Sequence, residues 1–302
     1  MTHNPLPRNG LQRNSVRNKR VLTAFAALAA AAAFGAGVSS SNIVGYMTPE
    51  NDVAGGNKMI GAMFADIGTQ AATPGTGSYS VQNIIPTGTS VPNGATVNTT
   101  DCIYLQKLTA AGATDGAILY WRDGSFKAGK QTVNFHGWYA SGVTTPADVT
   151  LTSGQAVWLY VPAGAVCSFT MSGEVPAGDV YMALNQNNTA VGNPQPTTID
   201  LQDVEPHAAE GYTVPNGATV NTTDCIYLQK LTPAGATDGA ILYWRDGSFK
   251  AGKQTVNFHG WYASGVTTPA DVTLAPGEGL WVFSPTAGIS LVFPSALPTS
   301  AE

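Results

Sequence analysis

Charged residues are scarce in this chain. Only 11% of its 302 residues are Asp, Glu, Lys or Arg. Five of the fourteen Lys and Arg residues lie at or before Arg20, whereas all nineteen acids follow it, so the chain beyond Arg20 has a formal charge of 9 − 19 = −10. Proteins that bind nucleic acid need a basic face. The charge distribution therefore argues against nucleic acid as a partner.

Cysteine is also rare, and its three residues are Cys102, Cys167 and Cys225. An odd number excludes a fully paired set of disulfides, and Cys102 and Cys225 could pair only with their Cα atoms within about 7 Å. We expect all three to be small buried residues on strands. The chain has no Cys-x-x-Cys motif and no Cys/His cluster of the kind that binds zinc. The sequence therefore indicates neither a metal site nor a cofactor.

Long apolar runs are lacking except near the N-terminus, at residues 21–34. This Ala-rich run is short of the ~20 strongly apolar residues of a membrane span, so a retained anchor is the weaker alternative. Basic residues precede the run and small residues end it, which predicts a cleaved signal peptide over 1–37. We therefore expect export to the cell surface, the periplasm or the medium, with membrane contact only if this segment stays uncleaved. The basic residues are Arg13, Arg17, Lys19 and Arg20, and the small ones are Ala33, Gly35, Ala36 and Gly37.

Motifs for catalysis are missing as well. There is no Gly-x-Ser-x-Gly and no His-Glu-x-x-His. His136 and His259 have no nucleophile nearby in sequence, and we interpret them as structural or exposed strand residues. Aspartates directly before glycine are interpreted as turn residues rather than calcium ligands, because calcium needs several converging oxygens. They are Asp115, Asp123, Asp238 and Asp246. No catalytic residue is assigned, and we expect the protein not to be an enzyme.

What the sequence does contain is a repeat. Residues 91–151 reappear as 214–274 with a constant offset of 123 and a single difference, Ala110 against Pro233. Each copy is neutral, with four bases and four acids. Fainter matches link 57–63 with 180–184 and 81–86 with 201–206. These similarities predict two tandem domains, 42–173 and 174–302.

Within each domain the pattern favours strands. Runs rich in Val, Ile, Tyr and Trp recur every 8–12 residues between Gly, Pro and Asn breaks, as at 102–108, 117–122, 132–139, 156–161 and 166–171. Asp123-Gly124 predicts a hairpin turn with a return strand from Ser125. Short helical turns are expected near 81–85 and 201–204, and a loop over 185–196. The predicted fold is all-β, with two duplicated β-sandwich or jelly-roll-like domains after an N-terminal signal helix.

All six tryptophans belong to repeat pairs. Trp158 and Trp281 lie in apolar runs and are expected in the core. For the other pairs two interpretations remain: buried core residues, or exposed aromatic faces that stack on sugar rings. The second interpretation defines a candidate carbohydrate-binding site in each repeat, formed by Trp121, Trp138 and Tyr139 in the first and by Trp244, Trp261 and Tyr262 in the second.

Two short stretches resemble a group of exported β-proteins from Gram-negative bacteria. The first is Ser-Asn-Ile-Val-Gly-Tyr at 41–46, followed by Asn57-x-Met59-Ile60-Gly61. The second is Leu-Ala-Pro-Gly-Glu-Gly-Leu-Trp-Val at 274–282, from which the first repeat departs with Thr152-Ser153. The group has no assigned activity, so the resemblance implies export and β structure and identifies no site residue.

Together these observations favour an exported structural or adhesive surface protein without catalysis. Its neutral repeated segments oppose self-association only weakly, because little charge repulsion acts between them. Two equivalent domains would also give bivalent attachment to a repeated target. The alternative is a carbohydrate-binding protein with one aromatic site in each repeat. The expected partners are accordingly further copies of the chain or a surface glycan.

Overall fold

The computed structural model describes residues 44–47, 53–66, 77–88, 91, 102–108, 114–128, 130–216, 224–231, 237–251 and 253–297. The predicted signal peptide lies outside these residues. Within them, no helix is long and apolar enough to cross a membrane. Residues 42–302 form one compact unit.

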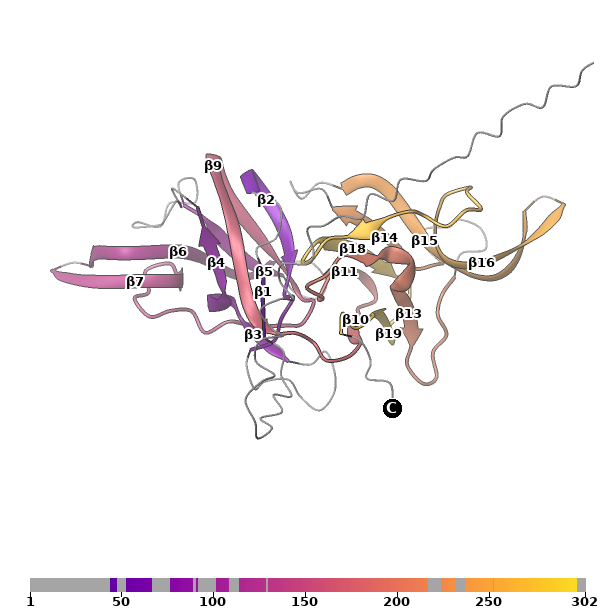
Figure 1. Cartoon of the computed structure of the whole chain (residues 1–302), viewed down its shortest axis with the longest axis horizontal. Coiled ribbons are helices and arrows are strands. Elements are labelled where there is room, and N and C mark those ends of the chain that lie inside the picture. The colour runs from indigo at the N-terminus through magenta and orange to yellow at the C-terminus, as the bar shows by residue number, and fades with distance from the viewer. Residues whose placement is uncertain are drawn as a thin grey trace, which may run out of the picture. The chain divides into compact units, whose positions relative to one another are not determined.

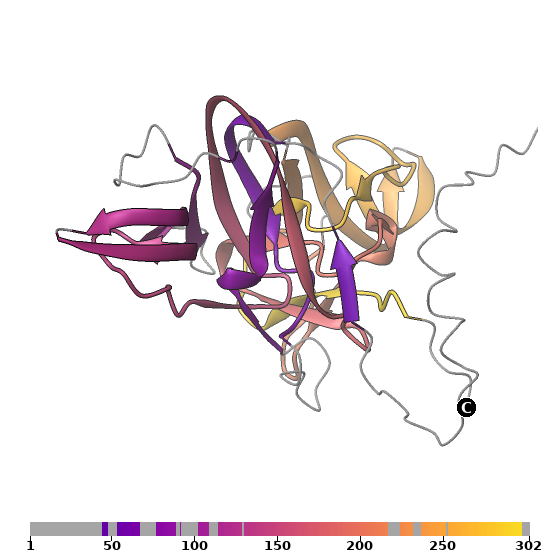
Figure 2. The same ribbon diagram turned by 60° about the vertical axis from the view of Figure 1, so that its left-hand side comes forward.

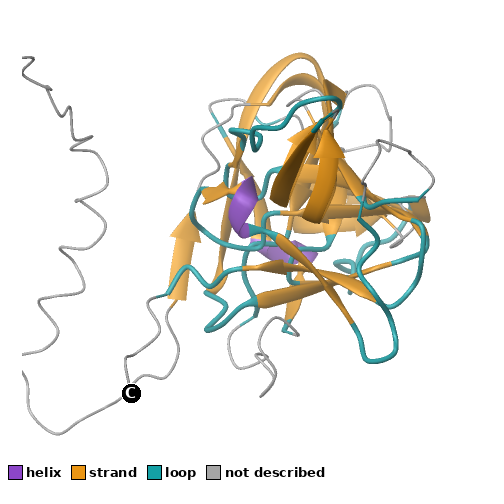
Figure 3. Cartoon of the chain, turned by 90° about the vertical axis from the view of Figure 1, so that its right-hand side faces the viewer, coloured by secondary structure: helices purple, strands orange, loops and turns teal. Residues whose placement is uncertain are grey.

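The described residues are strands and loops with two 3-10 turns, which confirms the all-β class (Figure 3). In the first half, the central strand is β9 (Ala156–Glu174). Its 19 residues pair with β2 and β5 near the start and with β1 and β4 near the end. From β5 the sheet continues through β6 to β7, while β3 pairs separately with β8. These strands are β1 (Val44–Met47), β2 (Val53–Gly61), β3 (Ser78–Ser80), β4 (Ile84–Thr87), β5 (Tyr104–Leu108), β6 (Thr114–Ala128), β7 (Gln131–Ala140) and β8 (Thr150–Thr152).

The second half repeats this plan with a broken central strand (Figure 1). A five-stranded sheet has the order β11-β18-β14-β15-β16, and a three-stranded sheet has the order β10-β19-β13. Strands β18 and β19 together therefore correspond to β9 of the first half. The break lies at a turn where the Ser284 hydroxyl donates to the Thr286 carbonyl at 2.7 Å. The strands are β10 (Val180–Leu184), β11 (Asn187–Gly192), β12 (Ile199–Asp200), β13 (Glu205–Ala208), β14 (Tyr227–Leu231), β15 (Thr237–Ala251), β16 (Gln254–Ala263), β17 (Thr273–Leu274), β18 (Gly279–Ser284) and β19 (Ile289–Phe293).

Each half has its own apolar cluster, and strand alternation explains the choice of residues. Along β9, Val157, Leu159 and Val161 are buried, while the residues between them are only half-buried. The period-2 geometry of a strand places such alternate residues on one face. The second cluster uses the equivalent residues Leu280 and Val282 of β18. The repeated sequence thus builds two cores of the same design.

A glutamine in each half closes the edge of the outermost strand. The 3-10 turn η2 (Val81–Asn83) carries Gln82, whose amide donates to the carbonyls of Trp138 and Ala147 and accepts from the Trp138 N–H, each at 2.9 Å. A carboxamide bonded to both backbone groups of one residue replaces a neighbouring strand. Gln202 in η3 (Leu201–Asp203) does the same for Trp261. Both short helical turns predicted from the sequence are confirmed.

Gly137 and Gly260 make this arrangement possible. Both have positive φ, at 131° and 121°, and a Cβ built at either position would overlap the Oε1 of the capping glutamine. A side chain here would therefore be disfavoured by backbone strain and by the loss of the cap.

The hairpin predicted at Asp123-Gly124 is wrong. Strand β6 runs through these residues to Ala128, and the last pair of the β6–β7 ladder is Ala128 with Gln131. Gly124 instead takes a φ of 97° inside the ladder, where it pairs with Phe135. The Asp-Gly pair thus signalled positive φ correctly, but the ladder absorbs that residue without reversing the chain. Asp115 also lies within β6, and Asp238 within β15, rather than at turns.

The diverged flanks hold two further corrections. Residues 185–196 contain strand β11 instead of being all loop, because Asn187 to Gly192 pair with β18. The structural counterpart of the end of β2 is also β11 and not residues 180–184. Gly61 pairs with Ala156 as Gly192 pairs with Gly279, which occupies the same place in the repeat as Ala156. The backbone pairing therefore identifies β11 as the counterpart of the end of β2, which the short apolar similarities in sequence did not.

The two halves meet at these glycines. A Cβ on Gly61 would lie 2.6 Å from the Gly192 Cα, so only glycine allows this approach. Backbone bonds cross the junction from the Gly61 N–H to the Gly277 carbonyl at 2.9 Å and from the Gly192 N–H to the Gly154 carbonyl at 2.9 Å. Lys58 of β2 is buried here, and burial lowers its pKa while the opposing charge of Glu278 partly restores it.

Candidate functional site

The aromatic residues proposed to bind sugars are all buried. Trp138 and Trp261 are 0% exposed, and the other four residues are 3–4% exposed. Trp121 packs edge-on against Trp138 with ring centroids 5.4 Å apart, and Trp244 and Trp261 reproduce this geometry. The Trp138 indole N–H donates to the Ile84 carbonyl at 2.6 Å, and that of Trp261 to the Val204 carbonyl at 2.7 Å. None of the six rings offers an open face for a sugar to stack on.

Tyr139 and Tyr262 belong to an aromatic clamp around an arginine. The Arg122 guanidinium lies 3.5 Å from the centroid of the Phe135 ring and 5.7 Å from that of Tyr139. It also donates to the Val143 carbonyl at 3.1 Å. Burial lowers the pKa of Arg122, yet the guanidinium keeps its charge at neutral pH. This cation–π contact, repeated at Arg245, is a structural use of the aromatic residues.

Trp158 and Trp281 are only half-buried, and they share one location. Both pack against a small cluster of Met59, Ala156 and Ala190, which comes from both halves. The predicted core position therefore proves to be the junction between the repeats. Sequence periodicity could not distinguish a core from a junction, since both select apolar residues. The expected burial of all three cysteines is confirmed, but only Cys167 lies on a strand, whereas Cys102 and Cys225 precede β5 and β14.

The most prominent exposed feature is a pair of two-stranded ribbons, visible as β6–β7 in Figures 1 and 2. Strand β5 pairs with β6 only as far as Tyr120, so beyond Trp121 strand β7 is the one strand neighbour that β6 has among the described residues. We call residues 122–137 the first arm and residues 245–260 the second arm. Both lie in the identical segments, so their sequences are the same.

The arms carry the exposed basic charge of the described protein. Past Arg20 the chain has nine bases. Three of them are buried, and Lys107 and Lys230 donate to the carbonyls of Thr150 and Thr273. The remaining four are exposed and form no ion pair with a described residue: Lys127, Lys130, Lys250 and Lys253.

A histidine–aspartate pair lies on each arm. Asp123 accepts from the His136 imidazole at 3.0 Å, and Asp246 pairs with His259 at the same distance. The two histidines differ in one respect. His259 also contacts Glu205 through its Nε2 at 3.2 Å, and the place of Glu205 is taken by Ile85 in the first half. The hydrogen bond to Asp246, with a smaller contribution from Glu205, raises the pKa of His259 despite partial desolvation.

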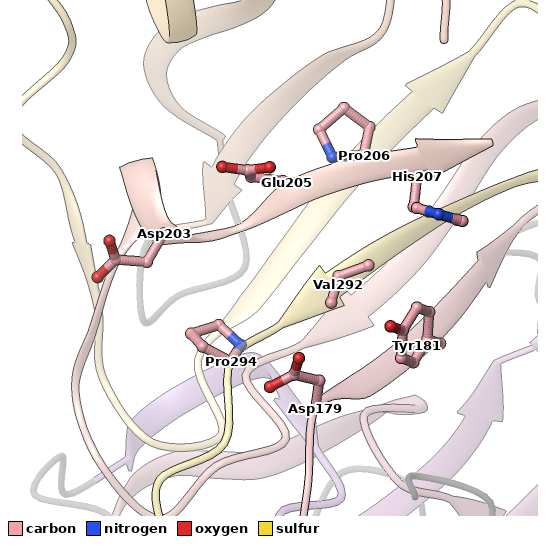
Figure 4. A pocket seen from close by; sticks show the side chains of 8 residues that line it. All are labelled: Asp179, Tyr181, Asp203, Glu205, Pro206, His207, Val292 and Pro294. Atoms are coloured by element: carbon pink, nitrogen blue, oxygen red, sulfur yellow. The ribbon is translucent and has the colours of Figure 1, made fainter. Parts of the chain in front are cut away.

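A pocket of about 280 Å³ opens beside Glu205 in the second half (Figure 4). Figure 4 shows carboxylates of Asp179, Asp203 and Glu205 around it, with Tyr181 and His207 at one end. Counting from the shared glutamines, the first half has Asn83 and Ile85 in place of the last two acids. The pocket is therefore a product of the diverged flank.

The repeated segments could not reveal this pocket, because all of its lining residues lie outside 214–274. The available signal was the change from Asn83 and Ile85 to Asp203 and Glu205 in otherwise matching stretches. Among the described residues, no group of three or more His, Cys, Asp or Glu side chains is placed to hold a metal ion. Comparisons with known protein families, with curated proteins and with solved structures find no match.

Proposed function

We propose that the protein is exported and acts as a non-catalytic structural or adhesive surface component that self-associates. In this proposal the chain is two tandem sandwich-like domains that follow a cleaved signal peptide. The observation that supports it most directly is that one compact unit has two exposed ribbons, the two arms, with identical sequence. Two identical attachment surfaces make a chain bivalent, which multiplies binding to any repeated target.

The use of the conspicuous side chains supports this proposal. The tryptophans and arginines of the repeat are buried and pack against other side chains of the protein. What each arm leaves exposed is a short backbone edge with hydroxyl, amide and lysine side chains. Such a surface suits association through backbone and polar contacts. In the described part of the arms the imidazoles bond to carboxylates and to no hydroxyl or thiol, so no nucleophile lies beside a base there.

A carbohydrate-binding function is the second candidate, and one observation favours it. Tyr181 is 53% exposed at the rim of the pocket that Asp179, Asp203 and Glu205 line. An exposed aromatic ring beside carboxylates can stack on a sugar and accept bonds from its hydroxyls. The first half has Asn83 and Ile85 where the second has Asp203 and Glu205, so this single site would replace the predicted site in each repeat.

Sizing of the chain without residues 1–37 tests the first candidate. Light scattering across a range of protein and salt concentrations, together with negative-stain microscopy, should show species larger than a monomer. A strict monomer under every condition contradicts self-association. A glycan array with the same protein tests the second candidate. Binding that is lost in Tyr181→Ala, with sizing unchanged, would favour the sugar site.

A further inference from the structure

We infer that the arms recognise a second copy of this chain by antiparallel backbone pairing along the outer parts of β7 and β16. The inference rests on the proposed self-association and specifies the surface that performs it. The surface comprises residues 131–134 of β7 and the identical residues 254–257 of β16. We call these two stretches the open edges.

The inner part of each edge is closed by side chains. Trp138 has its backbone N–H and carbonyl bonded to the Gln82 amide, and the His136 N–H donates to the Tyr139 hydroxyl at 3.3 Å. β16 repeats both contacts, with Gln202 on Trp261 and Tyr262 on His259. These caps occupy the backbone groups that another strand would use. They thereby protect this part of the edge from pairing.

The outer part of the edge has no such cap among the described residues. In an antiparallel ladder, alternate residues direct their backbone groups away from the partner strand. The register of β6 with β7 is constant from Leu119–Ala140 to Ala128–Gln131. The backbone N–H groups of Trp138 and His136 point away from β6. By alternation, those of Asn134 and Thr132 do so too. Their N–H and carbonyl groups face the side of β7 opposite to β6.

The edge of β7 is better suited to pairing than that of β6. On β6, Gly124 has a φ of 97°, which interrupts the extended conformation in the middle of the arm. No residue from 131 to 136 has a positive φ. Strand addition needs a regular row of donors and acceptors. The geometry therefore selects β7 and β16.

The open edge is complementary to itself. If two edges run antiparallel with Val133 opposite Val133 of the other copy, Thr132 lies opposite Asn134 and Asn134 opposite Thr132. Each such pair can exchange two backbone bonds, and the hydroxyl and amide side chains meet on one face, where they can also bond. No charged residue lies directly opposite a like charge. Because each chain has two open edges, the contact extends into an open chain of copies.

Charge supplies a distinguishing property. Each arm carries three bases, Arg122, Lys127 and Lys130 or their equivalents, against one aspartate, so two arms side by side repel weakly. Salt screens this repulsion, and pairing between arms should strengthen as ionic strength rises. Docking of a basic arm into the acidic pocket of another copy would weaken instead. The direction of the salt dependence thus separates two modes of self-association.

Proline substitution on one rung of the ladder provides a matched test. Asn134 pairs with Ser125, and these side chains bond to each other, so replacing either residue removes the same contact. Proline at Asn134 deletes an N–H on the β7 edge, whereas proline at Ser125 deletes one on the β6 edge. Prolines whose N–H would face solvent are tolerated on edge strands. The variants are Asn134→Pro with Asn257→Pro, and Ser125→Pro with Ser248→Pro.

We expect the β7/β16 double variant to need at least ~10-fold more protein for assembly than the unmodified chain. Asn134→Pro alone should stop at dimers, because one open edge remains. The β6/β15 double variant should assemble normally, and thermal unfolding verifies that every variant is folded. The inference is overturned if assembly is unchanged in the β7/β16 variant, if it is lost only in the β6/β15 variant, or if salt weakens it. Each of these results would still be compatible with self-association. A monomeric unmodified chain overturns both.

Discussion

His136 and His259 lie on the same rung of two arms with one sequence, yet their surroundings differ. His136 contacts Asp123, whereas His259 lies between Asp246 and Glu205. The difference comes from outside the repeat, because Glu205 belongs to a flank in which the first half has isoleucine. Identical segments can therefore acquire different chemistry from the strands packed beside them. The internal construction of the arms, by contrast, is preserved in both halves.

The largest expected effect tests whether the two cores are equivalent. Trp138→Ala and Trp261→Ala should each lower the free energy of unfolding by about 3–5 kcal/mol, because each removes a fully buried indole and leaves a cavity. Urea denaturation followed by circular dichroism measures both losses. The half-buried Trp158 is the matched control, and Trp158→Ala should cost less than either. A loss below ~1 kcal/mol in only one half would break the equivalence.

The junction glycines should follow. Gly61→Ala places a methyl group against the Gly192 backbone, and Gly192→Ala does the reverse. Each should lower the free energy of unfolding by about 1–3 kcal/mol through overpacking. Since one separation of the strands relieves both clashes, the double variant should cost less than the sum. Strict additivity in denaturation experiments would indicate that the two glycines do not touch.

Removal of the glutamine caps compares the halves once more. Gln82→Ala and Gln202→Ala should each cost about 1–3 kcal/mol, because the backbone groups of the capped tryptophan lose bonding partners. Hydrogen exchange at the Trp138 or Trp261 amide should accelerate only in the altered half. Gln82→Glu is a close control, since a carboxylate still accepts from the Trp138 N–H but cannot donate. Unchanged exchange in Gln82→Ala would contradict the role of this residue as a strand substitute.

The smallest effect concerns the histidine that differs. Glu205→Ile reproduces the first half, and it should lower the pKa of His259 toward its ordinary value of 6.5 while Asp246 still raises it. NMR titration of the imidazole signals measures the change, with the His136 signal as an internal reference. An unchanged His259 titration would show that the Glu205 contact carries no weight in solution.

The same variant has a pH-dependent consequence for stability. A histidine whose pKa is raised by folding stabilises the folded state below its unfolded-state pKa, and this contribution disappears as pH rises through the folded value. The unmodified protein should therefore exceed Glu205→Ile in stability near pH ~5.5 and converge with it near pH ~8. Both partners are more than half exposed, so the difference should stay within the ~0.2–1 kcal/mol of surface pairs. A gap that widens with pH would contradict this assignment.

Much of the architecture could be predicted from the sequence. Alternating apolar residues indicate the strands, and the similar stretches 81–86 and 201–206 indicate the two helical turns. The prediction of a hairpin turn at Asp123-Gly124 was wrong, because a residue with positive φ can also lie inside a strand ladder, as Gly124 does. The six candidate sugar-binding residues are buried in the structure. Their burial could not be predicted, because it depends on segments distant in sequence, as the bonds of the Trp138 and Trp261 indoles to Ile84 and Val204 show.

By itself the sequence determined that one unit is used twice and that this unit is built from strands. Those properties follow from local composition, spacing and repetition. Tertiary structure alone decided that the aromatic residues are buried, that Gln82 and Gln202 cap the edge strands, and that an acidic pocket opens in one half. Each of these depends on contacts between residues separated by more than fifty positions in the chain. Such contacts arise from sheet register and packing, which local sequence does not specify.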